Sequence, residues 1–126
     1  MADLIHKELS YKIVDLAFEV FNSLGAGLKE KNYADAFEIL LKDENISYVR
    51  EIYYPLKIRE KVVGRNYFDF FVENKIIVEL KSGDRHYHEA CTQLFQYLKI
   101  SRVDLGIVIR FTNEGVKYKR IPNISD

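Results

Sequence analysis

Apolar residues recur at helical spacing over the first part of the chain. The period between Leu4 and Leu24 predicts an amphipathic helix. Gly25 and Gly27 then favour a helix end and a tight turn. A second helix is predicted over residues 30–43, where the apolar stripe consists of Tyr33, Ala34, Phe37, Leu40 and Leu41. Glu30 lies one turn before that stripe, so we expect it to point toward the buried side.

The rest of the chain reads mainly as strands. The predicted strands cover residues 47–58, 66–73, 76–81, 105–111 and 116–121, and a third helix covers 86–100, with Asp84 as a candidate cap. Pro55 marks an edge or a bend in the first strand, and residues 59–64 are a predicted turn. The apolar run 105–111 is typical of a buried strand. This order predicts one α/β domain over residues 1–126, with a mixed central sheet flanked by helices.

Charged residues interrupt the most strand-like stretch, FDFFVENKIIVELKSGD, at residues 68–84. Alternation along a strand puts Glu79 and Lys81 on one face. If the two strands pair through a turn centred on Asn74, Asp69 falls opposite Glu79, with Cβ atoms roughly 5 Å apart. That register requires an odd-length loop or a bulge. A two-residue turn would instead place the carboxylates on opposite faces.

Two convergent carboxylates and an amine support a definite chemistry. Adjacent carboxylates repel, and a hard cation such as Mg²⁺ resolves that repulsion with one or two carboxylates plus substrate phosphate. A nearby ammonium can position a water and offset charge on a phosphate. The set fits metal-assisted phosphodiester hydrolysis. The alternative is a solvated, salt-bridged face, since such acid spacings are common. The central position of both strands favours the functional interpretation.

The predicted third helix adds a further pair. Gln93 and Tyr97 are four residues apart and share one helical face. They follow directly on the strand that carries Glu79 and Lys81, so the two groups can meet in space. The alternative is that Gln93 is an edge residue and Tyr97 a core tyrosine.

Taken in order, these residues resemble the PD-(D/E)XK nuclease superfamily, in particular its RecB-like branch. The resemblance rests on Asp69, then Glu79-Leu80-Lys81, then Gln93 and Tyr97. In addition, GLKEKNY at residues 27–33 matches the Gly-x-x-Glu-x-x-Tyr (GxxExxY) motif of a small bacterial and archaeal family in that superfamily. The similarity covers about residues 10–122. Phe68 stands where the superfamily often has Pro, a position without a chemical role.

The resemblance implies a restriction-endonuclease-like core and a set of roles. Catalysis would involve Asp69, Glu79 and Lys81. The Mg²⁺ or Mn²⁺ ligands would be Glu30, Asp69, Glu79 and the backbone carbonyl of Leu80. The substrate would be positioned by Gln93, Tyr97 and Tyr33, although a tyrosine inside a helical apolar stripe is usually a core residue.

Composition restricts the binding modes and the cellular compartment that fit this activity. Nineteen basic and nineteen acidic residues cancel, so no general basic field supports nonspecific polyanion binding. The single cysteine, Cys91, excludes an internal disulfide and a cysteine-based zinc site. No secretory signal or membrane-length apolar run is recognisable, which favours a cytoplasmic protein. Basic residues around the turn near residue 60 are candidate phosphate contacts: Lys57, Arg59, Lys61 and Arg65.

Two functions remain open on this basis. The first is a metal-dependent nuclease acting on nucleic acid, with DNA as the expected substrate. The alternative is a nucleic-acid-binding or protein-interaction module that keeps the nuclease fold without turnover. A chain of 126 residues supplies a catalytic core and little else, which favours a homodimer or a larger complex.

Overall fold

A computed structural model describes residues 5–124 as three helices and one five-stranded sheet. The elements in chain order are α1 (Lys7–Leu24), α2 (Glu30–Asp43), β1 (Tyr48–Ile58), β2 (Lys61–Val72), β3 (Ile76–Ser82), α3 (Tyr87–Ser101), β4 (Leu105–Thr112) and β5 (Gly115–Pro122). The predicted order is confirmed. The expected helix start at Leu4 lies outside the described residues, and α1 begins at Lys7. None of the described helices is long and apolar enough to cross a membrane.

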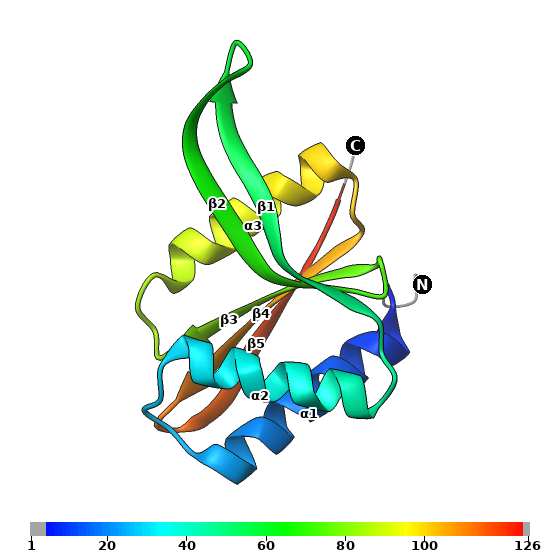
Figure 1. Ribbon diagram of the computed structural model, residues 1–126, viewed down its shortest axis with the longest axis vertical. Coiled ribbons are helices and arrows are strands. Elements are labelled where there is room, and N and C mark those ends of the chain that lie inside the picture. The colour runs from blue at the N-terminus through cyan, green and yellow to red at the C-terminus, as the bar shows by residue number, and fades with distance from the viewer. Residues whose placement is uncertain (1–4, 125–126) are drawn as a thin grey trace.

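The sheet is mixed and follows the chain order β1-β2-β3-β4-β5. Strands β3 and β4 are parallel and joined by α3, whereas the other neighbouring pairs are antiparallel. Helices α1 and α2 cover one face and α3 covers the other (Figure 1). The predicted α/β restriction-endonuclease-like architecture is therefore confirmed. Both predicted edge strands, β1 with its Pro55 and β5, lie at the edges of the sheet.

Apolar alternation along the strands fills both layers. Residues Val78, Leu80, Ile107 and Ile109 pack with the apolar stripes of α1 and α2. The intervening positions, among them Ile77 and Val108, pack with Ala90, Leu94 and Leu98 of α3. Since β3 and β4 are covered on both faces, they read as almost continuous apolar runs.

Two local expectations were wrong. Residues 61–64 belong to β2, because the turn consists only of Arg59 and Glu60, both with positive φ values of 48° and 66°. A tight two-residue turn of this kind matches the twist of a hairpin. Asp84 does not cap α3: its carboxylate pairs with Arg110 at 2.6 Å, and the capping position falls on His86.

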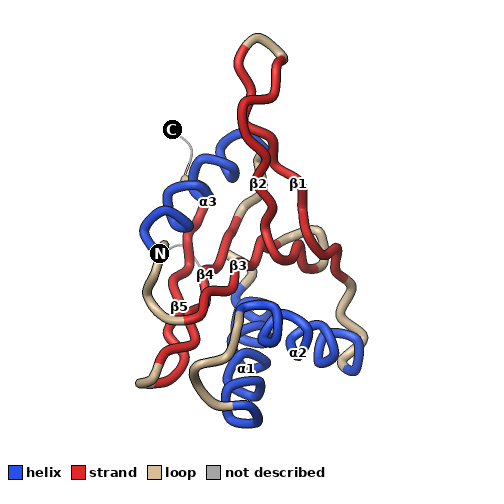
Figure 2. Tube along the Cα trace, turned by 60° about the vertical axis from the view of Figure 1, so that its left-hand side comes forward, coloured by secondary structure: helices blue, strands red, loops and turns tan. Residues whose placement is uncertain are grey.

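Strands β2 and β3 form a fork. Their ladder comprises only three pairs, the last being Phe70 with Val78. Beyond it β2 continues with β1, while β3 continues with β4. The β1–β2 hairpin therefore projects from the body as an arm, visible at the top of Figures 1 and 2. The angle between these strands leaves backbone groups near the fork without ladder partners.

We expect Gly106→Ala to destabilise the protein. A Cβ at Gly106 would lie 2.6 Å from Cδ2 of the fully buried Leu94, so β4 and α3 would have to move apart. Overpacking of this kind typically costs about 1–3 kcal/mol, which urea denaturation would measure. The matched control is Gly64→Ala on β2, where the nearest atom is the terminal carbon of half-exposed Leu56 at 3.2 Å. Equal stability of the two variants would contradict the tight α3–sheet contact.

Candidate active site

The fork between β2 and β3 is closed by two side chains. The backbone N–H of Asp69 donates to Oε1 of Glu79 (3.1 Å), and the N–H of Leu80 donates to Oδ2 of Asp69 (2.7 Å). These bonds replace the ladder hydrogen bonds that the diverging strands cannot make. Each carboxylate is thus held against the backbone of the opposite strand.

The turn sets this arrangement. It contains three residues, 73–75, and Glu73 and Asn74 adopt left-handed φ values of 54° and 55°. An odd loop pairs Val72 with Ile76, and the same register continued along the strands sets Asp69 opposite Glu79. The register on which the sequence argument depended is confirmed.

Lys81 lies between two acids. Its Nζ is 3.5 Å from Oε2 of Glu79 and 3.9 Å from Oε1 of Glu30, and only 17% of its side chain is exposed. Glu30, at the first position of α2, also accepts a hydrogen bond from the N–H of Ser82 at 3.4 Å. The start of α2 is thereby attached to the end of β3. Four predicted residues (Glu30, Asp69, Glu79 and Lys81) are therefore brought together.

Burial makes the two carboxylates difficult to ionise together. Removal from water, and then the charge of Asp69, raises the pKa of Glu79 to about 8, although Lys81 opposes the shift. Burial likewise raises the pKa of Asp69, against the hydrogen bond from Leu80. Because the two carboxyl groups interact, the ionisation of each one depends on the charge of the other. At neutral pH the metal-free site therefore retains a proton on this pair, because ionising both carboxyls in so buried a place is unfavourable.

This resistance to ionisation is the property that fits a hard cation, since a bound positive charge would take the place of the retained proton. Two adjacent carboxylates with raised pKa values are suitable oxygen ligands for a divalent ion whose other positions are filled by water or substrate. No group of three or more Asp, Glu, His or Cys side chains within residues 5–124 is arranged to hold a metal ion. Glu30 faces Lys81 and Ser82 in place of joining the pair, so its role as a ligand stays a prediction.

A cavity of about 310 Å³ opens beside Asp69. Its lining comprises Glu30, Lys31, Ala34, Arg50, Glu51 and Asp69. The sequence analysis missed Arg50 and Glu51. Glu51 lies on β1 beside Asp69, at a break in the ladder where its own φ is 63°. The Arg59-Glu60 turn by itself would set Arg50 opposite Asp69, and only the bulge between Leu56 and Lys57 shifts the register so that Glu51 lies there.

Tyr33 does not position a substrate, and this expectation is corrected. Its side chain is fully buried and stacks on Phe111 with ring centroids 4.1 Å apart. Its hydroxyl donates to the carbonyl of Gly25 (2.7 Å) and accepts from the N–H of Leu28 (3.3 Å). Tyr33 therefore holds the loop before α2, and so acts on the site only through the placement of Glu30.

Gln93 and Tyr97 lie on the expected helix, but neither is hydrogen-bonded to Lys81 within the described chain. Gln93 is exposed. Tyr97 packs on Tyr54 and Phe68, with centroid distances of 4.9 and 5.1 Å. Tyr97 is therefore next to the residue that precedes Asp69, while its contact with a substrate stays a prediction.

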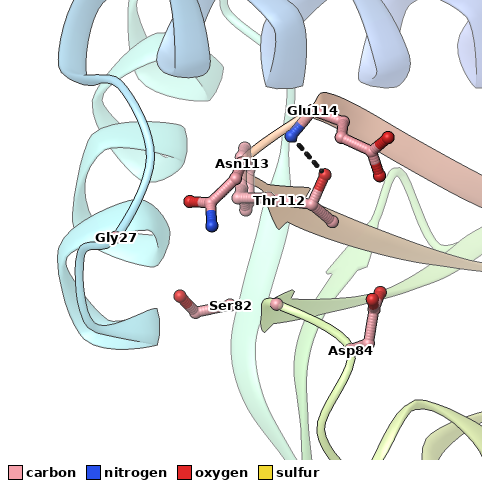
Figure 3. A pocket seen from close by; sticks show the side chains of 8 residues that line it. Gly27, Ser82, Asp84, Thr112, Asn113 and Glu114 are labelled. Carbon is pink, nitrogen blue, oxygen red and sulfur yellow. Dashed lines mark hydrogen bonds between the residues drawn. The ribbon is translucent and has the colours of Figure 1, made fainter.

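A second hollow, of about 350 Å³, lies at the carboxyl ends of β3 and β4 (Figure 3). Ligands often bind at such ends of parallel strands. Its acids are already paired, Asp84 with Arg110 and Glu114 with Lys117. The hydroxyl of Thr112 accepts from the N–H of Glu114, the dashed line in Figure 3. We assign this hollow no chemistry, since both of its acids already form ion pairs with basic side chains of the chain itself.

Fold and site together define a class: a mixed sheet whose fork holds two acids and a lysine. The sequence profile described as the PD-(D/E)XK nuclease superfamily matches residues 7–121. The chain belongs to this superfamily and is a nuclease-fold protein. Divalent metals are the general cofactors of its nucleases.

Among solved structures, the chain is similar to the protein described as SSO0001. The two share 23% identity, with a TM-score of 0.53, over 74% of this chain and 50% of that one. This likeness shows a common fold, and the chain spans about half the length of that protein. The curated proteins contain no match to the sequence.

The raised pKa of Glu79 predicts a pH dependence of stability. Between its ordinary value of 4.5 and about 8, the native protein holds a proton that the unfolded chain has released. Without divalent metal, the free energy of unfolding should therefore fall as pH rises through this window. Glu79→Gln should remove most of the fall and be more stable than wild type at pH 8 by on the order of 1–3 kcal/mol.

Urea denaturation in EDTA across this pH range measures the effect. Near pH 4.5 the wild type and Glu79→Gln should have similar stabilities. The matched control is Glu114→Gln, whose carboxylate is exposed on the hairpin between β4 and β5 and should leave the pH dependence unchanged. A wild-type stability that stays constant over the same interval would show that Glu79 ionises normally in the folded protein.

Proposed function

We propose that this protein hydrolyses phosphodiester bonds in nucleic acid, with DNA as the substrate and Mg²⁺ or Mn²⁺ as the cofactor. The observation that carries the proposal is the fork, where Asp69, Glu79 and Lys81 converge within hydrogen-bonding or ion-pair distance. Membership of the nuclease superfamily supports it.

Each residue at the fork would have its own role in the reaction. Asp69 and Glu79 would hold the cation, with Leu80 adding its carbonyl oxygen, and the bound ion would neutralise charge on the phosphate. Lys81 would hold a water for in-line attack at phosphorus and donate to the oxygens that gain charge. The phosphorus–oxygen ester bond breaks, and the leaving oxygen takes up a proton. Glu30 would fix the Lys81 amine, as its ion pair supports.

We further propose that the chain belongs to the RecB-like branch and to the GxxExxY family. The motif residues act together in the structure, which supports this finer assignment. Glu30 reaches Lys81 and Ser82, and Tyr33 binds the loop that contains Gly27 through Gly25 and Leu28. The three motif positions thus attach one loop to the end of β3.

Lys81→Ala and Asp69→Ala should each abolish metal-dependent cleavage. Removing one transition-state donor typically lowers the rate by about 100- to 1000-fold, and removing a metal carboxylate also weakens the cation site. The assay follows loss of full-length labelled DNA with Mg²⁺ or Mn²⁺. Lys42→Ala, on the exposed end of α2, is the matched control and should cleave normally. Full activity of Lys81→Ala would contradict the assignment.

Mg²⁺ or Mn²⁺ should stabilise the wild-type fold, a result independent of activity. A ligand at about 100 times its dissociation constant adds about 2.7 kcal/mol, which should raise the unfolding midpoint by roughly 5–10 °C for a chain of this size. Asp69→Asn and Glu79→Gln should lose this shift, whereas Glu114→Gln should keep it. A shift that survives in Glu79→Gln would place the cation elsewhere.

The rival function is a binding module that keeps the fold without turnover. The internal hydrogen bonds of Asp69 and Glu79 favour it, because they stabilise the fork without a cation. Nucleic-acid binding that persists in EDTA and survives Glu79→Ala, together with no cleavage of DNA or RNA, would support this rival over the nuclease.

A further inference from the structure

The arm formed by β1 and β2 beyond the fork, residues 52–67, differs in charge from the rest of the chain. It carries four basic residues (Lys57, Arg59, Lys61 and Arg65) and one acidic residue, Glu60. The arm has a net charge of +3, so the remainder of this neutral chain carries −3. Within residues 5–124, none of the four cations forms an ion pair. They are available to an anionic partner.

Two aromatic side chains stand exposed on the same arm. Tyr53 on β1 lies directly opposite Tyr67 on β2, with ring centroids 5.3 Å apart at an angle of 41°. Their exposed fractions are 45% and 55%. Exposed tyrosines flanked by unpaired cations form the combination that binds single-stranded nucleic acid, in which bases stack on rings and phosphates meet the charges.

The exposed pair is aligned with the candidate active site. Alternate positions of a strand share a face, so Tyr67 and Arg65 follow Asp69 outward along β2. At about 3.3 Å per residue they lie about 7 and 13 Å beyond Asp69 along the strand. The face of the arm thus presents an acid of the site, then an aromatic pair, then a cation.

A groove lies beside the arm, along the edge strand β1. It has a volume of about 520 Å³ and lies between β1 and the end of α3. Tyr53, Tyr54, Lys57 and Tyr97 are among its lining residues. Tyr97 itself packs on Tyr54 and Phe68, on the face of the arm opposite Tyr53 and Tyr67, so the groove meets the exposed pair only along the edge strand β1.

We propose that the arm is a guide for single-stranded nucleic acid, which it holds unpaired and leads to the fork. Bases would stack on Tyr53 and Tyr67, and phosphates would contact Lys57 and Arg65. A regular duplex does not fit this surface, because its base faces are already stacked on one another. This inference rests on the proposed function in one respect, that the bound nucleic acid leads to an active site at the fork. It deepens that function by naming single-stranded nucleic acid as the substrate class.

The competing occupant of this surface is a second copy of the chain, which would pair with the arm through β1. Pro55 lacks an N–H, and the register shifts between Leu56 and Lys57, so the edge is interrupted where a partner strand would pair. Prolines and bulges are common protections against edge pairing. Repulsion between two arms of charge +3 also opposes such a dimer.

Binding without metal tests the guide separately from cleavage. Fluorescence anisotropy in EDTA would compare a labelled single-stranded DNA with the duplex of the same sequence. Tyr53→Ala with Tyr67→Ala should weaken single-strand binding by about 10-fold or more and change duplex binding little. The phenylalanine pair should bind like wild type, because stacking needs the ring only. Tyr11→Ala, a 47% exposed tyrosine on α1, is the matched control.

Charge removal gives a second readout. Lys57→Gln with Arg65→Gln should weaken binding and reduce its salt dependence. Three results would overturn the proposal: stronger wild-type binding to duplex, undiminished single-strand binding by the folded alanine pair, or no binding by a wild type that dimerises through Tyr53 and Tyr67. Absence of cleavage with these binding results intact would overturn only the proposed activity.

Discussion

The structure of the site depends on the divergence of β2 from β3. Three ladder pairs hold the strands together, and the carboxylates of Asp69 and Glu79 then accept N–H groups of the opposite strand. One pair of side chains therefore both completes the sheet and forms the site. The same divergence releases the arm, so the candidate chemistry and the surface that would present a substrate arise from one irregularity in the sheet.

The fork has an energetic consequence. Only 12% of the Glu79 side chain is exposed, and burial beside Asp69 raises its pKa to about 8. An arrangement chosen for stability alone would place apolar residues at such positions, as β3 does at Val78 and Leu80. A buried acid that is costly to ionise, inside an otherwise consistent core, is typical of functional sites, where binding of a positive charge offsets the cost.

The loop before α2 links the site to the hydrophobic core. Tyr33, stacked on Phe111, binds the loop through Gly25 and Leu28. The carbonyl of Leu28 accepts from the hydroxyl of Ser82 at 2.6 Å. A residue with no exposed surface can thus determine where Glu30 meets Lys81, which explains how a core tyrosine belongs to a motif that also includes a site acid.

The sequence by itself determined the element order and the faces of the strands, because helical and strand periods are local properties. It left the pairing of Asp69 with Glu79 conditional on the length of one turn, which the structure sets at three residues. Tertiary structure alone decided the rest. The burial of Tyr33 and the place of Tyr97 depend on how helices pack against the sheet. The position of Glu51 in the lining of the cavity depends on how β1 pairs with β2. Such contacts join residues that are distant in the chain, so no local pattern in the sequence predicts them.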